Sequence, residues 1–311
     1  MTTVQLEYIV AVDTYRHFSI AAENCCVTQP TLSMQIQKLE EDLDVKIFDR
    51  SKQPVIPTEI GEEIIIQARN VLKEVQKIKE IISDKKNKIS GEIRLGIIPT
   101  LAPYLLPLFL PDFIKKYPHI KLKIFEFTTD ILVEKLKNNL LDVGLLVTPL
   151  NDINLFENKL FVEEFVVYLS KSHELLNKKY VLPNEIDVSK LWLLEEGHCI
   201  RSQIVRLCEL KTKIKENQLF EYEAGSIETL KKMVEINDGI TILPELSLND
   251  LTPQQLLYVR KFSDPVPVRE VSLVTHRNFV KKRLIEVLQK EIVLSVPLKM
   301  KERENKIVVE I

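Results

Sequence analysis

Residues 58–83 constrain the fold most, because their apolar side chains repeat at a spacing that only a long helix satisfies. Thr58 can cap this helix, and three acids fall in its first turn, where the helix dipole favours negative charge. The apolar positions then advance alternately by four and three residues: Ile64, Ala68, Val71, Val75, Ile78 and Ile82. This narrow heptad seam predicts a linker helix that pairs with a second copy of the chain. Packing against the rest of its own chain is the alternative.

The segment after this helix divides the chain. Residues 84–90 are mostly charged or polar and interrupt the apolar pattern, which predicts a hinge. The hinge and helix separate a small domain, residues 1–57, from a larger one, residues 91–295, and 311 residues are enough for two cores. Residues 296–311 are rich in charge, and we expect a tail that the fold does not need.

The first 57 residues predict three short helices followed by a β-hairpin wing. Ser19 is the expected cap of the second helix and Thr28 that of the third. The segments 47–49 and 55–57 can pair as the two strands of the wing. The third helix should bury one apolar face, made of Leu32, Ile36, Leu39 and Leu43.

The opposite face of the third helix is polar and carries no acid before Glu40. Its residues are Gln29, Pro30, Thr31, Ser33, Met34, Gln37 and Lys38. A hydrogen-bonding helix surface at this place in a helix-turn-helix suits base edges in the major groove of double-stranded DNA. Arg50, after the first wing strand, would lie near phosphate. The formal net charge of −2 gives no independent support, and a merely solvated polar face is the alternative.

From Gly91 onward, short apolar strands alternate with helices. We expect strands within 93–97, 122–126 and 143–147, and helices within 102–116, 130–139 and 226–236. This order is typical of a two-subdomain α/β sensor of the periplasmic-binding-protein type. Subdomain I would comprise residues 91–162 and 268–295, and subdomain II residues 163–267, with crossovers near 161–164 and 265–269.

Ligands in such sheets bind beyond the carboxyl ends of the strands. Thr100 and Thr129 each follow a predicted strand, although each could equally be a helix N-cap.

Composition excludes several classes of protein. The N-terminal residues lack the basic and apolar regions of a signal peptide. The longest apolar stretch, residues 101–113, is too short to span a membrane and contains three prolines. The five histidines and four cysteines have no metal-ligand spacing, and we expect no cofactor. So few cysteines suit the reducing cytoplasm.

Two of the cysteines, Cys199 and Cys208, lie in one segment of helical spacing. At ~1.5 Å per residue, their Cα atoms would be roughly 13 Å apart in a helix. A disulfide needs Cα atoms within about 7 Å, so any bond between them requires this helix to unwind. Cys199 follows Gly197 and His198 at the expected start of the helix. There the helix dipole, backbone N–H groups and Arg201 should lower the thiol pKa. Two inert buried thiols are the alternative.

Two sets of residues resemble one known family. The winged helix-turn-helix of LysR-type transcriptional regulators is similar to the segments Phe18-Ser-Ile-Ala-Ala22, Val27-Thr-Gln-Pro-Thr-Leu-Ser33, Gln35-Ile-Gln-Lys-Leu-Glu40 and Phe48-Asp-Arg50. Residues 195–203, Glu-Glu-Gly-His-Cys-Ile-Arg-Ser-Gln, followed by Cys208, resemble the redox loop of OxyR-type peroxide sensors within that family.

The resemblance implies a regulator rather than an enzyme. Its partners would be a DNA operator, hydrogen peroxide and RNA polymerase, and its linker helix would form a homodimer within a homotetramer. Cys199 would be oxidised by peroxide and resolved by Cys208 as a disulfide. The residues implied to bind peroxide are Thr100, Thr129, His198 and Arg269.

Two other functions remain open at this point. A LysR-type regulator could bind a small organic effector in the same cleft, with Cys199 and Cys208 purely structural. A thiol peroxidase would use the same cysteine but would turn over with a reductant, whereas a sensor reacts once.

Overall fold

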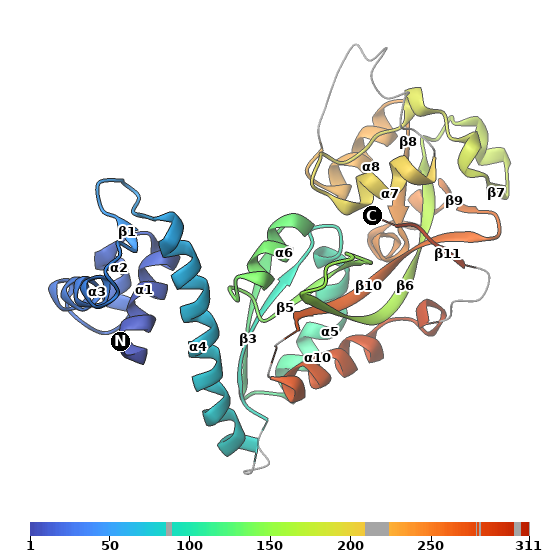
Figure 1. The fold of residues 1–311 in the computed structure, drawn as a ribbon. Helices are drawn as coiled ribbons and strands as arrows, with labels where there is room; N and C mark the ends of the chain where they lie inside the picture. The colour runs from blue at the N-terminus through green and yellow to red at the C-terminus, as the bar shows by residue number, and fades with distance from the viewer. Residues whose placement is uncertain (85–88, 209–223, 278, 280, 302–305, 311) are drawn as a thin grey trace. The chain divides into compact units, whose positions relative to one another are not determined.

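A computed structural model of the chain describes residues 1–84, 89–208, 224–277, 279, 281–301 and 306–310 (Figure 1). The chain divides into two compact units, Met1–Lys88 and Ile89–Ile311. Within the described ranges, no helix is both long and apolar enough to cross a membrane.

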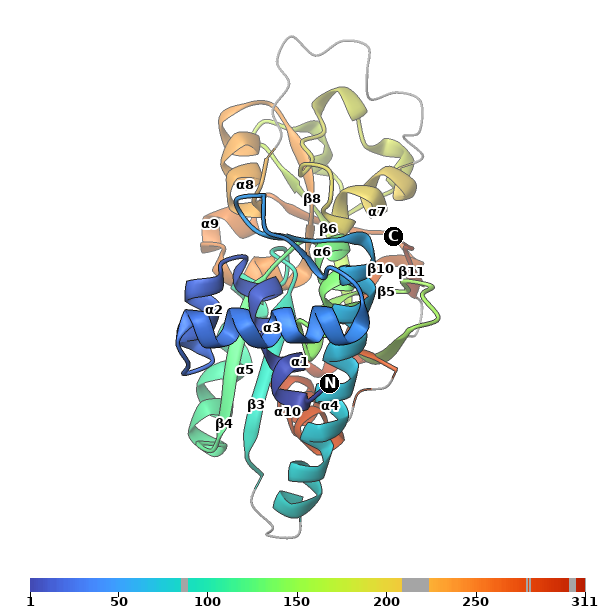
Figure 2. The ribbon, with the colours of Figure 1, turned by 60° about the vertical axis from the view of Figure 1, so that its left-hand side comes forward.

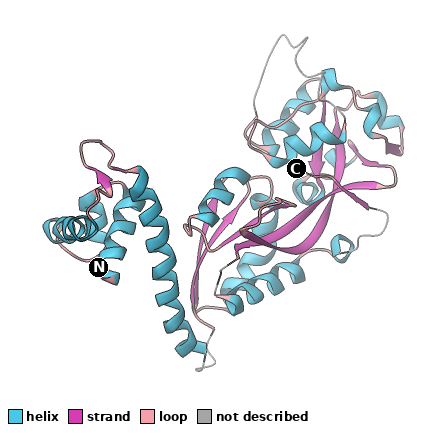
Figure 3. Ribbon diagram, in the orientation of Figure 1, coloured by secondary structure: helices cyan, strands magenta, loops and turns pink. Residues whose placement is uncertain are grey.

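The first unit is helical apart from one hairpin (Figure 3). Its described elements are α1 (Thr3–Tyr15), α2 (Phe18–Asn24), α3 (Gln29–Leu43), β1 (Phe48–Asp49), β2 (Ile56–Pro57) and α4 (Glu59–Asp84). Strands β1 and β2 pair antiparallel, with Phe48 opposite Pro57, which confirms the predicted wing.

Of the two N-caps predicted for α2 and α3, one is confirmed and one is wrong. Thr28 Oγ1 accepts a hydrogen bond from Thr31 N, so Thr28 caps α3 as predicted. The predicted cap of α2, Ser19, is wrong, because His17 Nδ1 accepts the amide of Ser19 and the helix already begins at Phe18.

The inner face of α3 is largely as predicted. Leu32, Ile36 and Leu39 are fully buried. Leu43 is 38% exposed, contrary to the prediction, because α3 ends there and Asp44 turns the chain with φ 53°.

The start of α4 lies against the wing. A Cβ on Gly61 would be 2.0 Å from Ile47 O, so only glycine permits this approach. Farther along, Ile65 and Ala68 are buried in the core of the first unit, and α4 packs on α1.

Beyond Ala68, the described part of the predicted heptad seam is exposed in the single chain at Val71 and Ile78 and half-buried at Val75. Val71 is 39% and Ile78 62% exposed. The side chain of Ile82 and residues 85–88 of the predicted hinge lie outside the described residues. An unpaired apolar stripe of this kind is what a pairing helix would present.

The second unit is built on a mixed sheet. Its described strands run in the order β4-β3-β5-β10-β6-β9-β7, with β11 beside β10 and β8 beside β6. They are β3 (Gly91–Ile97), β4 (Ile120–Glu126), β5 (Val143–Thr148), β6 (Leu155–Leu169), β7 (Tyr180–Val181), β8 (Ile240–Pro244), β9 (Val259–Phe262), β10 (Val266–His276) and β11 (Lys306–Val308). β3 is parallel to β4 and β5, whereas β10 is antiparallel to β5 and β6.

Helices pack on both sides of these strands. They are α5 (Ala102–Lys116), α6 (Thr129–Lys137), α7 (Cys199–Leu207), α8 (Ile227–Ile236), α9 (Pro253–Leu256) and α10 (Lys282–Ser295), with short 3₁₀ turns at Glu174–Asn177, Pro183–Glu185, Val188–Lys190, Glu245–Asp250 and Leu298–Lys301. α5 and α10 contact each other beside the parallel strands (Figure 1). These elements confirm the predicted α/β class.

Two long strands join the halves of the second unit. β6 pairs with β10 over Leu155–Glu164 and with β8 over Phe165–Leu169, so one strand passes from one half to the other (Figure 1). The crossovers predicted near 161–164 and 265–269 fall on β6 and at the start of β10, and the division into two subdomains stays a prediction. Their register places Arg269 directly opposite Glu163.

The C-terminal segment is part of the fold, contrary to the expectation of a dispensable tail. Met300 is 2% and Val309 8% exposed, and both belong to the core cluster of the second unit. β11 adds a parallel strand to β10 (Figure 2). The composition of residues 296–311 is charged, but Val296, Met300 and Val309 are buried in the core, whereas Leu298 and Ile307 are exposed.

Candidate DNA-reading helix and redox site

The predicted DNA-reading face of α3 is accessible. Its exposed members are Gln29, Pro30, Thr31, Met34, Gln37 and Lys38, while Ser33 is half-buried. The only carboxylate hydrogen-bonded to a residue of this face in the described structure is that of Glu41, which accepts from Gln37 Nε2 at 3.0 Å. The face is therefore free for hydrogen bonds to base edges, as a recognition helix requires.

Arg50 joins the wing to this face. Its Nη1 donates to Ser33 Oγ at 3.1 Å, its Nη2 lies 3.2 Å from Glu40 Oε2, and its guanidinium stacks over Phe18 at 5.0 Å. The Glu40 side chain is 1% exposed and also accepts the amides of Ile47 and Phe48. This acid therefore fixes the wing to α3 and is shielded from phosphate.

The second site begins where α7 starts. Gly197 has φ 93°, a conformation that other residues adopt only with strain, and it turns the chain into the helix. His198 occupies the N-cap position without a side-chain cap bond, and its Nε2 lies 3.6 Å from Glu195 Oε1. Cys199 is the first residue of the helix, as predicted, and Cys208 is its C-cap.

Burial dominates the chemistry of Cys199. The residue is 4% exposed, and this desolvation raises the pKa of its thiol. The positive charge of Arg269, the Thr129 hydroxyl and the backbone N–H groups of Cys199 and Ile200 all act in the opposite direction. The predicted lowering of the pKa is therefore wrong in net direction, because burial outweighs the helix N-terminus.

Thr129 carries an unsatisfied polar atom beside this thiol. Its Oγ1 is buried and has no hydrogen-bond partner of normal geometry among the described residues. Neither Thr129 nor Thr100 is an N-cap, since α6 begins after Thr128 and α5 after Leu101. Apart from the neighbouring Cys199 sulfur, a weak acceptor, the Thr129 hydroxyl therefore has no hydrogen-bond partner among the described residues.

Arg269 is held in a buried network that spans the unit. Its side chain is completely buried and lies 2.7 Å from the Glu163 carboxylate, which is also completely buried. Nη1 and Nη2 donate to Oγ1 and the carbonyl of Thr100, each at 3.1 Å. Glu163 Oε1 in turn accepts from Leu246 N at 2.7 Å. The guanidinium is thus fixed from β6, from the loop before α5 and from the turn after β8.

The structure therefore brings Thr129 and Arg269 to Cys199 at the head of α7, and Thr100 to the guanidinium of Arg269. His198 is next to them in the chain, but its ring is directed to Glu195. Cys208 is half-buried, and burial raises the pKa of its thiol to about 12. All four cysteines are free.

Two residues at this site were not predicted. Glu163 and its neighbour Glu164 are acids between apolar runs of β6, a signal that the sequence does contain. Gln203 lies one helical turn after Cys199 and is fully buried, and its Oε1 has no hydrogen-bond partner among the described residues.

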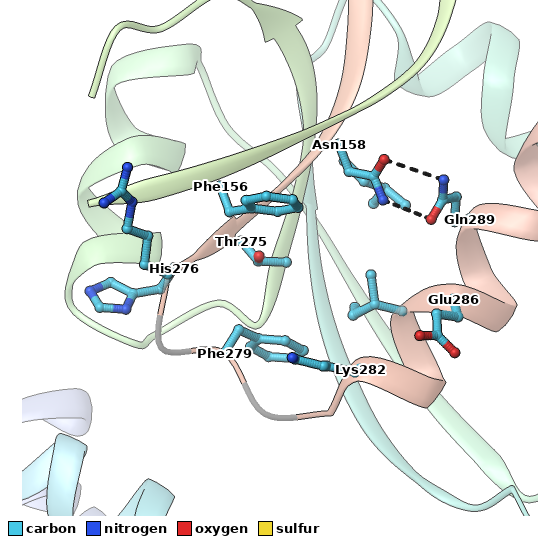
Figure 4. A pocket seen from close by; sticks show the side chains of 11 residues that line it. Phe156, Asn158, Thr275, His276, Phe279, Lys282, Glu286 and Gln289 are labelled. Atoms are coloured by element: carbon cyan, nitrogen blue, oxygen red, sulfur yellow. Dashed lines mark hydrogen bonds between the residues drawn. The ribbon is translucent and has the colours of Figure 1, made fainter. Parts of the chain in front are cut away.

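A separate pocket of about 340 Å³ lies between the ends of β6 and β10 and the start of α10 (Figure 4). Phe156, Thr275 and Phe279 border it, and Asn158 hydrogen-bonds to Gln289 along its wall. None of the predicted site residues lines this pocket.

Comparisons with known proteins identify the family of both units. The profile described as "Bacterial regulatory helix-turn-helix protein, lysR family" matches residues 3–62, and "LysR substrate binding domain" matches residues 86–292. The "Hydrogen peroxide-inducible genes activator" of Haemophilus influenzae is 36% identical over 88% of this chain and 90% of that protein. The "DNA-binding transcriptional dual regulator OxyR" of Escherichia coli is 34% identical over 88% of this chain and 89% of that protein.

The similarity extends to solved structures. A full-length OxyR variant from Pseudomonas aeruginosa superposes with a TM-score of 0.81 at 35% identity, covering 95% of this chain and 99% of that one. The matched families and relatives are transcription regulators, not enzymes. The chain therefore belongs to the LysR family of bacterial transcriptional regulators, and within it to the OxyR-type group.

Proposed function

We propose that this chain is a peroxide-responsive transcriptional regulator, switched when hydrogen peroxide oxidises Cys199 and a Cys199–Cys208 disulfide forms. One observation carries the proposal: a buried thiol, the unpaired hydroxyl of Thr129 and the buried guanidinium of Arg269 meet at the head of α7. A peroxide molecule is small, uncharged and able to donate and accept hydrogen bonds, so it would satisfy Thr129 Oγ1 beside the sulfur. The names of the relatives support peroxide as the signal.

The first chemical step consumes one peroxide. The Cys199 thiol first loses its proton to solvent, its thiolate sulfur attacks one peroxide oxygen, the O–O bond breaks, and the departing hydroxide takes up a proton to leave as water. The product is a sulfenic acid. Negative charge that develops on sulfur is stabilised by Arg269 and by the backbone N–H groups at the helix start.

The second step forms the switch. The Cys208 thiol attacks the sulfenic sulfur, a disulfide forms, and a second water leaves. Because a nine-residue helix holds the two Cα atoms roughly 13 Å apart, α7 must unwind before the bond can close. Contacts made by α7 in the reduced chain are then lost, which is the event that the rest of the regulator would sense.

The DNA-binding part of the proposal is carried by α3 and the wing. The residues proposed to contact double-stranded DNA are Gln29, Pro30, Thr31, Ser33, Met34, Gln37, Lys38 and Arg50. Pairing of α4 through its exposed apolar stripe would place two such helices on two half-sites of an operator. Family membership supports a homotetramer, contact with RNA polymerase and a cytoplasmic location.

The experiment that tests the proposal is intact-mass analysis of the reduced protein after a brief, near-stoichiometric pulse of hydrogen peroxide. We expect a loss of two hydrogens, mapped to Cys199 and Cys208 within seconds and absent from Cys199→Ser. Slow oxidation scattered over all cysteines would contradict the proposal. Small molecules that raise the melting temperature equally in Cys199→Ser would then favour an organic effector.

A further inference from the structure

The C-terminal segment contacts the redox helix. β11 runs parallel to the start of β10, with Val268 opposite Val308, and Val309 N donates to Val268 O at 2.9 Å. Both ribbon views place this end of the chain beside α7 (Figures 1 and 2). The backbone carbonyl of the same residue, Val309 O, accepts a hydrogen bond from Gln203 Nε2 of α7.

This contact lies at the centre of α7. Gln203 is four residues after Cys199 and five before Cys208, and its side chain is fully buried. The side chain of Val309 is 8% exposed and belongs to the same apolar cluster as Ile200 and Ile204 of α7. The segment therefore contributes a buried hydrogen bond to the helix that must unwind, and its Val309 side chain belongs to the core that also buries one face of this helix.

Other contacts attach the segment to the sheet rather than to α7. The side chain of Lys306 is 10% exposed and lies 3.5 Å from Glu164 of β6. Lys299 pairs with the buried Glu245. Among the described residues of this segment, Glu310 forms an ion pair with Arg206 of α7 at 3.6 Å, which is exposed on both sides and should contribute little. The sheet thus provides a fixed base from which Val309 reaches the helix.

We propose that residues 306–309 are a brace that holds α7 in its helical form and limits the rate at which Cys208 resolves the sulfenic acid of Cys199. This inference rests on the proposed function. Disulfide closure requires unwinding, and unwinding removes Gln203 from Val309 O. Loss of this buried hydrogen bond corresponds to about a tenfold change in the opening equilibrium. The attack of Cys199 on peroxide precedes unwinding, so the brace should leave that first step unchanged.

The test compares the full chain with a variant that ends at Asn305. Sulfenic acid formation is followed by dimedone trapping, and disulfide closure by quenched-flow intact mass. We expect closure about tenfold faster in the shortened chain, with trapping within twofold of the full chain. Amide hydrogen exchange across residues 200–207 of the reduced protein should also be about tenfold faster, with α8 unchanged.

Two point variants keep the test decisive if the shortened chain does not fold. Val309→Ala retains the backbone bonds but trims the buried side chain, so it should accelerate exchange and closure by a smaller factor in the same direction. Glu310→Ala breaks only the exposed ion pair and should change neither. Unchanged closure and exchange in the shortened chain or in Val309→Ala would overturn the brace alone. Failure of the full chain to form any sulfenic acid would overturn the proposed function, whereas the exchange measurement would still report on the brace.

Discussion

Thr129→Val separates a peroxide-binding role of Thr129 from a structural one. The hydroxyl is buried without a normal hydrogen-bond partner, and an unsatisfied buried polar group destabilises a fold by about 1–3 kcal/mol. The neighbouring sulfur is a weak acceptor, so we expect the low end of this range. Valine is close in shape and should therefore stabilise the second unit by about 1 kcal/mol, which raises its melting temperature by about 2–4 °C.

The same substitution should slow oxidation. If the hydroxyl hydrogen-bonds peroxide or the developing thiolate, its loss costs about 1.5–3 kcal/mol in the transition state, or roughly a ten- to hundredfold lower rate. The measurement is Cys199 oxidation by stopped-flow mass analysis, paired with thermal unfolding. Thr128→Val is the matched control, because Thr128 makes no side-chain cap bond. An unchanged oxidation rate in Thr129→Val, or a loss of stability, would refute the reasoning.

Four further predictions concern other parts of the chain. Burial raises the pKa of the Cys199 thiol above its ordinary 9.0. Its thiolate fraction, and with it the rate of oxidation by peroxide, should therefore rise about tenfold per pH unit from pH 6 to 8. A rate that does not change with pH would mean that the thiolate is already formed. Arg269→Met should lower the free energy of unfolding by about 3–5 kcal/mol, because it leaves the Glu163 carboxylate buried and without its cation. Adding Glu163→Gln should restore much of this loss, as measured by denaturant titration. An equal or greater loss in the double variant would contradict the pairing. Gln37→Ala should weaken binding to a selected operator by about 1–3 kcal/mol in fluorescence anisotropy, with no change on random-sequence DNA; equal weakening on both would assign Gln37 to non-specific contact. Ile78→Asp should dissociate the dimer in sedimentation experiments, since Ile78 is exposed in the single chain; an unchanged sedimentation coefficient would place the interface elsewhere.

Local signals predicted the first unit well. Thr28 caps α3 and apolar residues at helical spacing are buried, because both features depend on neighbours within one or two turns. The same reasoning failed at Ser19, where the imidazole of His17 provides the cap instead. It also failed at Leu43, since the exact end of a helix decides whether its last apolar residue reaches the core.

The redox site depends on contacts that are distant in sequence. The 199–207 helix could be predicted, but the pKa direction of Cys199 could not, since burial by other segments decides it. Likewise, Arg269 meets Glu163 through the register of two strands 106 residues apart. The tail was misjudged for the same reason: its charged composition gave no indication that Val309 joins the core cluster that contains α7.

The stability of α7 links these observations to switching. An isolated helix of nine residues is marginal in water, so α7 persists because of its packing. Cys199, Ile200 and Ile204 supply that packing from one side, and Gln203 adds the bond to Val309. Oxidation of Cys199 inserts a polar oxygen where the sulfur is now almost fully buried, and burial of an unsatisfied polar group costs about 1–3 kcal/mol. A helix this dependent on tertiary contacts would open after so small a loss, which brings Cys208 within reach only when peroxide has reacted.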